Sequence, residues 1–316
     1  MSRPIAIVGL PDCGKTVLLT GLFKSDKWKI ESLNKDTMIF LEQKRQEIKN
    51  GKWPEPTPDN IKAKTFIQRI YSTSAKSSVI LKFRDFAGET WSRFINTYCE
   101  FDKALSPSDE GRELCDFLNE SAAIAICIDL EKLFDNDINQ KWITQAILNY
   151  LEKQHLSIPV ALVITKYDNV KPLLQERGIN GLVLSDTRHE INLKANKRRL
   201  LKIIGINSSK VTEEYVFAVS VVQSDLERYS DETQKYLPRK DSKPIGVSEL
   251  ENWIVKSYNT SVFIDKVKKF FKFWPMYIVL AGTIFCFTFI GQLVLYAGII
   301  LCMLYPFCFK PNKKKH

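Results

Sequence analysis

The feature that most limits how this 316-residue chain can fold is a set of short, almost wholly apolar runs between residues 4 and 222. The runs are PIAIVGL, AAIAICIDL, IPVALVIT and VFAVSVV. A strand with one solvated face alternates apolar and polar residues, whereas an uninterrupted apolar run is typical of a parallel strand with both faces covered. Helical patterns fill the intervals, notably at 137–154 and 248–258. The sequence therefore predicts a doubly wound α/β domain with a mostly parallel sheet over residues 1–262.

The cysteine spacing and the distribution of charge argue against several classes of protein. Seven cysteines without a CxxC pair or a Cys/His metal spacing disfavour a zinc module and a secreted disulfide framework. The formal net charge is +10, and the segment from Asp265 to the C-terminus contributes +7 of it through eight lysines and one acid. A nucleic-acid binder carries its basic residues on the folded domain, so we expect no nucleic-acid partner.

A second feature separates the C-terminal part from the rest of the chain. Residues 273–309 form a run of 37 without a charged residue. One straight helix of that length is about 55 Å long, against about 30 Å for the hydrocarbon core of a bilayer. Two passes that turn at Gly291 and Gln292 fit this thickness, so the run predicts a transmembrane hairpin in a lipid bilayer. A single long tilted helix, a re-entrant segment and a buried helical hairpin are the alternatives.

Lysines flank both ends of this run, in a basic juxtamembrane segment at 263–272 and a basic tail at 310–316. The positive-inside rule places both flanks on the cytoplasmic side of the membrane. We therefore predict a multi-pass membrane protein with two transmembrane helices, whose main domain and both termini are cytoplasmic.

The segment GLPDCGKT, residues 9–16, satisfies the pattern GxxxxGK[ST] and lies between the first predicted strand and a predicted helix, which is the context that the pattern requires. Its glycines let the backbone wrap so that N–H groups point at phosphates, and the start of the helix favours negative charge. Lys15 is expected to reach the β and γ phosphates, and the hydroxyl of Thr16 is expected to bind Mg²⁺. The loop residues expected to contact the nucleotide are Gly9, Asp12, Cys13, Gly14, Lys15 and Thr16.

Two further motifs follow predicted strands. In DFAGE, Asp85 can hold Mg²⁺ through water, and the N–H of Gly88 can sense the γ-phosphate. In TKYD, residues 165–168, the carboxylate of Asp168 can accept from guanine N1–H and N2–H₂ while the stem of Lys166 covers the base. Adenine has no such pair of donors, so this motif selects guanine.

Ser220 lies in VFAVSVV at the end of the last strand, where a backbone N–H can meet guanine O6. The four motifs occur in one fixed order, each after an apolar strand. Because the carboxyl ends of parallel strands meet at one edge of a sheet, we expect a single nucleotide site there, with Thr165, Lys166, Asp168 and Ser220 on its base side.

Together these residues resemble the translation-factor-like class of P-loop GTPases, with GLPDCGKT, DFAGE, TKYD and AVS standing for the motifs of that class. The resemblance covers roughly residues 4–258. WPEPTPD, residues 53–59, resembles the WPPxT switch segment of the bacterial double-GTPase branch, and the helix at 245–253 is similar to the last helix of that branch. The resemblance implies that Thr57 closes over Mg²⁺ and the γ-phosphate, with Thr65 as the alternative.

The chain departs from this class at Glu89, where Ras-like members carry a glutamine. A carboxylate can accept from the attacking water but cannot donate to the γ-phosphate, and its charge opposes an anionic transition state. We therefore expect slow hydrolysis, for which Arg93 or the arginine of a partner can compensate. The resemblance implies a catalytic set of Lys15, Gly88 and Glu89, and a metal-binding set of Thr16, Thr57 and Asp85.

The sequence thus predicts a membrane-anchored GTP hydrolase that binds GTP or GDP with Mg²⁺ and acts as a switch on an effector or GTPase-activating protein. Whether the chain forms a homodimer stays open. Two alternatives remain. One is a GTP-binding membrane scaffold that hydrolyses poorly, which Glu89 keeps open, and the other is an ATP-dependent P-loop enzyme.

Overall fold

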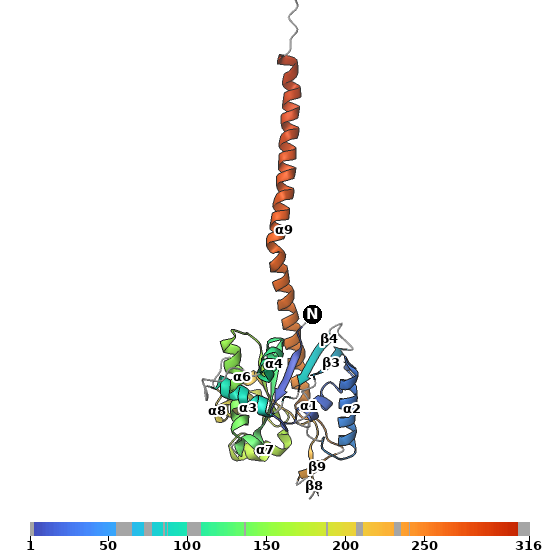
Figure 1. The fold of residues 1–316 in the computed structure, drawn as a ribbon, viewed down its shortest axis with the longest axis vertical. Helices are drawn as coiled ribbons and strands as arrows, with labels where there is room; N and C mark the ends of the chain where they lie inside the picture. Colours follow the sequence, from blue (N-terminus) through green and yellow to red (C-terminus); the bar gives the residue numbers. More distant parts are fainter. Residues whose placement is uncertain are drawn as a thin grey trace, which may run out of the picture. The chain divides into compact units, whose positions relative to one another are not determined.

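The computed structural model describes residues 3–308 except 55–64, 73–77, 85, 87, 100–108, 136, 188, 207–210, 231–234 and 240. Thr57, Asp85 and the basic tail at 310–316 therefore lie outside the described residues. The chain divides into two compact units, Met1–Val262 and Phe263–His316. Figure 1 labels the elements of both units.

A seven-stranded mixed sheet forms the centre of the first unit. The strands are β1 (Ile5–Gly9), β2 (Trp28–Ser32), β3 (Thr65–Ser72), β4 (Ser78–Arg84), β5 (Ala123–Asp129), β6 (Val160–Thr165) and β7 (Val216–Ala218). Their order across the sheet is β2-β3-β4-β1-β5-β6-β7. Within this sheet β3 pairs antiparallel with both β2 and β4, and the other four pairings described are parallel. The predicted α/β class is confirmed.

Burial follows the sequence pattern that predicted the strands. Every residue of β1, β5, β6 and β7 is buried, as expected for apolar runs covered on both faces. In β3 and β4 buried and half-buried residues alternate, which is typical of strands with one covered face. The sequence did not predict β2, whose residues WKIES pair with β3 at the edge of the sheet.

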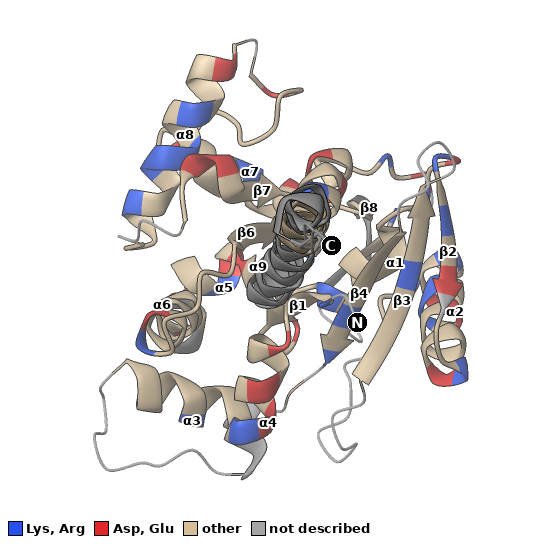
Figure 2. Cartoon of the chain, turned by 90° about the horizontal axis from the view of Figure 1, so that it is seen from above, with Lys and Arg blue, Asp and Glu red and all other residues tan. Residues whose placement is uncertain are grey.

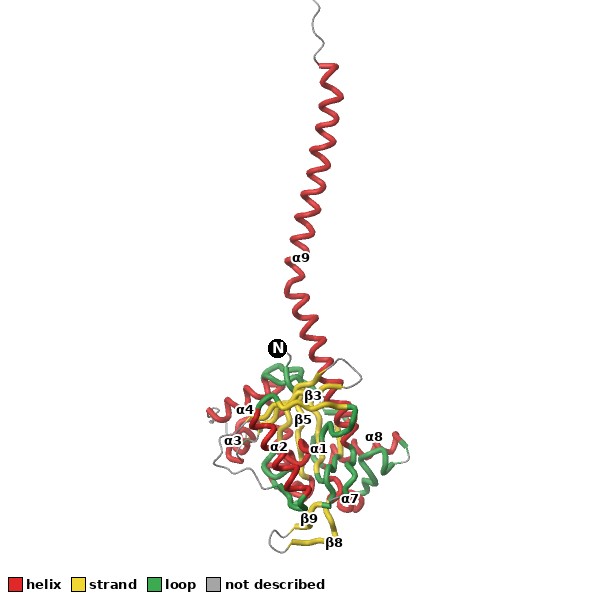
Figure 3. The backbone as a smooth tube through the Cα atoms, turned by 90° about the vertical axis from the view of Figure 1, so that its right-hand side faces the viewer, coloured by secondary structure: helices red, strands yellow, loops and turns green. Residues whose placement is uncertain are grey.

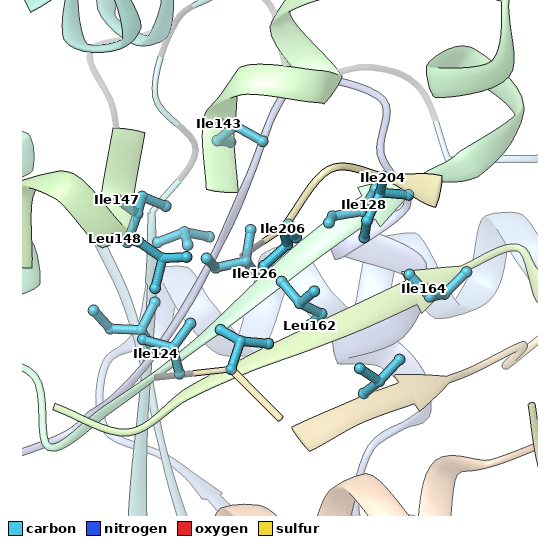
Figure 4. Close-up of a cluster of buried hydrophobic side chains, with 14 of the residues drawn as sticks. Ile124, Ile126, Ile128, Ile143, Ile147, Leu148, Leu162, Ile164, Ile204 and Ile206 are labelled. Carbon is cyan, nitrogen blue, oxygen red and sulfur yellow. The ribbon is translucent and has the colours of Figure 1, made fainter. Parts of the chain in front are cut away.

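Helices cover both faces of the sheet. One face carries α1 (Lys15–Gly21), α2 (Lys35–Lys49) and the first turns of α9. Buried residues of these three helices share one apolar core with Ile5 and Ile7 of β1. The other face carries α3 (Gly88–Tyr98), α4 (Asp109–Asn119), α6 (Ile138–Lys153), α7 (Tyr167–Glu176) and α8 (Glu190–Ile203). Figure 4 shows part of the core on this second face, where residues of α6 meet alternate residues of β5 and β6. The sheet thus separates two apolar cores.

Short elements connect these layers. The five-residue helix α5 (Leu130–Phe134) follows β5 directly, and a 3₁₀ turn, η1 (Glu213–Tyr215), precedes β7. After β7 the chain forms an antiparallel pair, β8 (Ser224–Ser230) and β9 (Lys235–Pro238), before α9 begins. Basic and acidic residues occur together on most helices, as Figure 2 shows. On α8, for example, Lys194 lies 3.4 Å from Glu190 and Arg198 pairs with Glu213 of η1.

The predicted transmembrane hairpin is wrong. A single helix, α9 (Val247–Cys308), continues through Gly291 and Gln292, where the hairpin was expected to turn (Figures 1 and 3). A glycine inside a helix costs only about 1 kcal/mol relative to alanine, which is too little to end a helix without other stop signals. In the part of the chain that the structure describes, no helix combines the length and the apolar composition needed to cross a membrane. The predicted two-span membrane localisation with cytoplasmic termini is contradicted by the same finding.

Candidate functional site

The candidate site lies at the carboxyl edge of the sheet, where β1, β5 and β6 end at Gly9, Asp129 and Thr165. These three strands are neighbours and run parallel. The connection after β1 leads to a helix on one face of the sheet, whereas the connections after β5 and β6 lead to helices on the other face. Open α/β sheets bind ligands at such a switch point.

The loop between β1 and α1 bends tightly through backbone conformations that few side chains tolerate. Gly14 has φ of 84° and Asp12 has φ of 60°, both in the left-handed region. A Cβ atom added to Gly9 would lie 2.6 Å from Cys13 Sγ and 2.7 Å from Cys127 O. The glycines that the motif requires are therefore imposed by backbone geometry and by close packing beneath the loop.

Lys15 follows this bend and is only 7% exposed. Its ammonium donates to two carbonyls of its own loop, Gly9 O at 2.9 Å and Leu10 O at 2.8 Å. These bonds fold the side chain back over the loop at residues 9–16, so its charge lies against that loop. The neighbouring Thr16 is half-buried in the first turn of α1.

Thr165 connects the loop at residues 9–16 with the TKYD segment. Its side-chain hydroxyl lies 2.5 Å from Cys13 O and 3.1 Å from Ile128 O, and the residue is 3% exposed. The Cβ that Gly14 lacks would lie 3.2 Å from Thr165 Cβ, so the two segments are in close packing contact. The structure therefore brings together the first and third predicted motifs.

The carboxylate of Asp168 is held from two sides. Its Oδ1 accepts from the hydroxyl of Ser220 at 2.6 Å, and its Oδ2 accepts from the backbone N–H of Ser224 at 2.9 Å. The N–H of Ser220 donates to Ile245 O at 3.1 Å, so in this structure it is engaged by backbone. Each carboxylate oxygen retains a second lone pair, which leaves acceptor capacity for a pair of donors on a ligand.

The sequence did not single out Asp129 and Ser224, which both contact predicted site residues. Asp129 Oδ2 lies 2.6 Å from Lys166 Nζ, and Ser224 fixes the second oxygen of Asp168. Asp129 did carry a recognisable signal, because it is the acidic end of an apolar strand, as Asp85 was expected to be. Ser224 carried none, since its contact depends on the path of the chain after β7.

Two buried thiols, those of Cys13 and Cys127, lie at the base of the loop at residues 9–16. Hydrogen bonding to Cys13 and burial together raise the pKa of Cys127 well above its usual value. Lys15 Nζ lies 3.9 Å from Cys13 Sγ. Because both cysteines are fully buried, they act as small packing residues that support the bend.

Several predicted catalytic and metal-binding residues are not placed. Gly88 and Glu89 begin α3, and only their backbone is described. Thr65, the alternative switch residue, is the first residue of β3 and pairs with Arg84 of β4. Arg84 directly precedes Asp85 in the sequence. Within the described residues no group of three or more His, Cys, Asp or Glu side chains could hold a metal ion. Of the predicted metal-binding residues Thr16, Thr57 and Asp85, the structure describes Thr16 alone.

Comparison with known proteins found no protein-family model and no curated protein that matches the chain.

Proposed function

We propose that this chain binds guanine nucleotides at the carboxyl edge of its sheet and hydrolyses GTP to GDP and phosphate, acting as a nucleotide-dependent switch. The observation that carries the proposal is the Thr165 bridge. It joins a bent, glycine-dependent loop with a buried lysine to a segment whose aspartate is held ready to accept. The proposed phosphate-binding loop and the proposed base-reading segment are therefore in direct contact, which supports a single nucleotide site.

The two ends divide the recognition of the nucleotide between them. The loop at residues 9–16 and the Lys15 ammonium supply positive charge and N–H donors for the phosphates, which is the main source of catalysis in phosphoryl transfer. At the other end, Asp168 offers two acceptors that match the N1–H and N2–H₂ donors of guanine. Mg²⁺, when bound, would neutralise charge on the phosphates. Among the residues that the structure describes, the hydroxyl of Thr16 would be its ligand.

Hydrolysis requires a group that orients the attacking water. Glu89 replaces the glutamine expected at the water-orienting position, which favours a second candidate function, a chain that binds GTP and does not turn it over. Single-turnover cleavage of GTP by the purified full chain separates the two functions, with Lys15→Ala as the inactive control. GTP cleavage that is lost in Lys15→Ala supports the hydrolase. No GTP cleavage by the wild type supports the binding protein.

Base selection provides the sharpest test of binding. Calorimetry of the full chain with GTP, GDP, ATP and XTP should show binding of the two guanine nucleotides and not of ATP. Asp168→Asn should weaken GTP binding about 10- to 100-fold and improve XTP binding, because an amide can donate to the xanthine C2 carbonyl.

Asp241→Asn is the matched control for this substitution. Asp241 is an exposed aspartate paired with Arg239 at 2.9 Å and is outside the site, so its variant should bind all four nucleotides like the wild type. If the wild type binds no guanine nucleotide, or if Asp168→Asn leaves GTP affinity unchanged, the proposed function is wrong.

A further inference from the structure

A buried aspartate that the sequence did not single out contacts the base-reading segment. Asp129 is the last residue of β5 and is only 1% exposed. Burying a carboxylate is costly unless its charge is paired and its lone pairs accept hydrogen bonds. The contacts of its two oxygens therefore show what this residue does.

The two oxygens of Asp129 have different partners. Oδ1 accepts from the backbone N–H groups of Glu131 at 3.1 Å and Lys132 at 3.4 Å, which caps the short helix α5. Oδ2 lies 2.6 Å from the ammonium of Lys166, 37 positions further along the chain. The N–H of Asp129 itself donates to Gln140 Oε1 at 3.3 Å, which fixes the backbone of the residue from α6.

The side chain of Lys166 is fixed at its two ends, by the backbone at one and by the contact of its ammonium with Asp129 at the other. Its backbone has φ of 52°, in the left-handed region, and it lies directly between the bridging Thr165 and the turn that carries Asp168. Its side chain is 35% exposed, so part of the stem faces solvent although the ammonium is paired with a buried carboxylate. A long lysine side chain otherwise samples many rotamers, and the ion pair restricts this freedom before any ligand arrives.

An exposed ion pair made by α5 provides a comparison. Lys132 Nζ lies 3.8 Å from Asp12 Oδ2 of the phosphate loop, and both side chains are well exposed, at 39% and 48%. Exposed pairs at this separation contribute little because water screens them. Of these two ion pairs, the buried one between Asp129 and Lys166 is the one that can order a side chain effectively.

We propose that Asp129 is a positioning residue for nucleoside binding, which holds the stem of Lys166 in place to cover the base. This inference rests on the proposed function, because it assigns Lys166 to the base-binding end of that site. A positioning role for Asp129 differs from a purely structural role as a helix cap. It predicts that changes at Asp129 weaken binding of the nucleoside part of the ligand and leave phosphate binding unchanged.

Asp129→Asn separates the two roles. Asparagine has one acceptor oxygen, and when that oxygen caps α5 its NH₂ group faces the Lys166 ammonium, so the cap is kept and the ion pair is lost. We expect the affinity of the full chain for GTP to fall about tenfold, while the affinity for inorganic tripolyphosphate, which has no base, is unchanged. Lys166→Met keeps much of the stem, loses the ammonium and should show the same loss, so the test does not depend on one variant folding.

The double variant shows whether Asp129 acts through Lys166. In the Lys166→Met background, Asp129→Asn should have no further effect on GTP affinity, which is the non-additivity expected of two residues in one contact. Lys132→Met removes the exposed pair and serves as the control, with GTP affinity expected to stay within twofold of the wild type. Isothermal titration calorimetry with Mg²⁺ present measures all of these affinities.

Three outcomes would overturn the inference. The two substitutions could weaken GTP binding additively, tripolyphosphate binding could fall in parallel with GTP binding, or GTP affinity could be unchanged in Asp129→Asn. In each case the wild type still binds GTP and the proposed function stands. A wild type that binds tripolyphosphate but not GTP removes both the proposed function and this inference.

Discussion

Replacing Thr165 by valine tests whether one hydroxyl holds the two ends of the site together. Valine keeps the branched shape of threonine but lacks Oγ1, the atom that lies 2.5 Å from Cys13 O and 3.1 Å from Ile128 O. Because Thr165 is 3% exposed, water has little access to replace the lost donor. The substitution therefore removes a hydrogen bond while leaving the packing almost unchanged.

The expected size of the effect follows from the burial of this hydrogen bond. The hydrogen bond itself contributes a net free energy of about 0.5–1.5 kcal/mol, and the cost of losing it rises to about 1–3 kcal/mol when its acceptor is buried. We therefore expect the free energy of unfolding to fall by about 1–3 kcal/mol. For a domain of this size class, that corresponds to a decrease in Tm of roughly 2–12 °C.

Thr144→Val is the matched control for this measurement. Thr144 is 1% exposed on α6, and its Oγ1 has no hydrogen-bond partner among the residues that the structure describes. The same chemical change there removes an unsatisfied hydroxyl, so stability should be equal to that of the wild type or slightly higher. Urea unfolding of the full chain, followed by circular dichroism, measures both variants.

The nucleotide affinities of the same two variants complete the test. Thr165→Val should bind GTP about tenfold more weakly, because the phosphate loop and the base-reading segment are no longer fixed to each other, whereas Thr144→Val should bind normally. Equal losses of stability in the two variants would refute the reasoning. The cost would then come from replacing any buried threonine by valine, and not from the hydrogen bond that Thr165 makes.

Three other predictions concern buried ionisable groups. Glu251→Ala removes the acceptor for the N–H of Phe23 and should lower the free energy of unfolding by about 1–3 kcal/mol. Because burial raises the pKa of Glu251, this loss of stability should shrink as the pH rises from about 4.5 through the folded-state pKa. Urea unfolding at several pH values measures the effect. Burial lowers the pKa of Lys197, so Lys197→Met should be at least as stable as the wild type near neutral pH, and any excess stability should disappear in urea melts as the pH rises towards 10.5. Hydrogen bonding to Cys13 and burial raise the pKa of Cys127, so iodoacetamide should label Cys127 only after unfolding, as peptide mass spectrometry can determine.

The core of the fold could be predicted because its strands carry a local signal. The runs that became β1, β5, β6 and β7 are apolar at nearly every position, and burial on both faces requires such runs. The edge strand β2 has no such requirement. Its residues WKIES alternate and are specified by pairing with β3, about 40 residues away, as in Ile30 opposite Ile70.

The candidate site shows the same division between local and distant information. The bend at Gly14 could be predicted, since the motif and the strand before it are contiguous in sequence. The contacts that organise the rest of the site join residues far apart, such as Thr165 with Cys13 and Asp129 with Lys166. A single sequence shows that these residues end strands, but only the strand order makes them neighbours.

The failed hairpin prediction shows what a length argument omits. Gly178 ends α7 because it has φ of 73° and because the next residue, Ile179, donates to Leu174 O at 2.8 Å while its side chain is buried in the core. Gly291 has neither support: it is helical, and a Cβ added to it would meet no described atom within 4 Å outside its own helix. A glycine ends a helix when the chain beyond it has a surface to pack on. The length of an apolar run shows how far a helix can extend, but it does not place a turn.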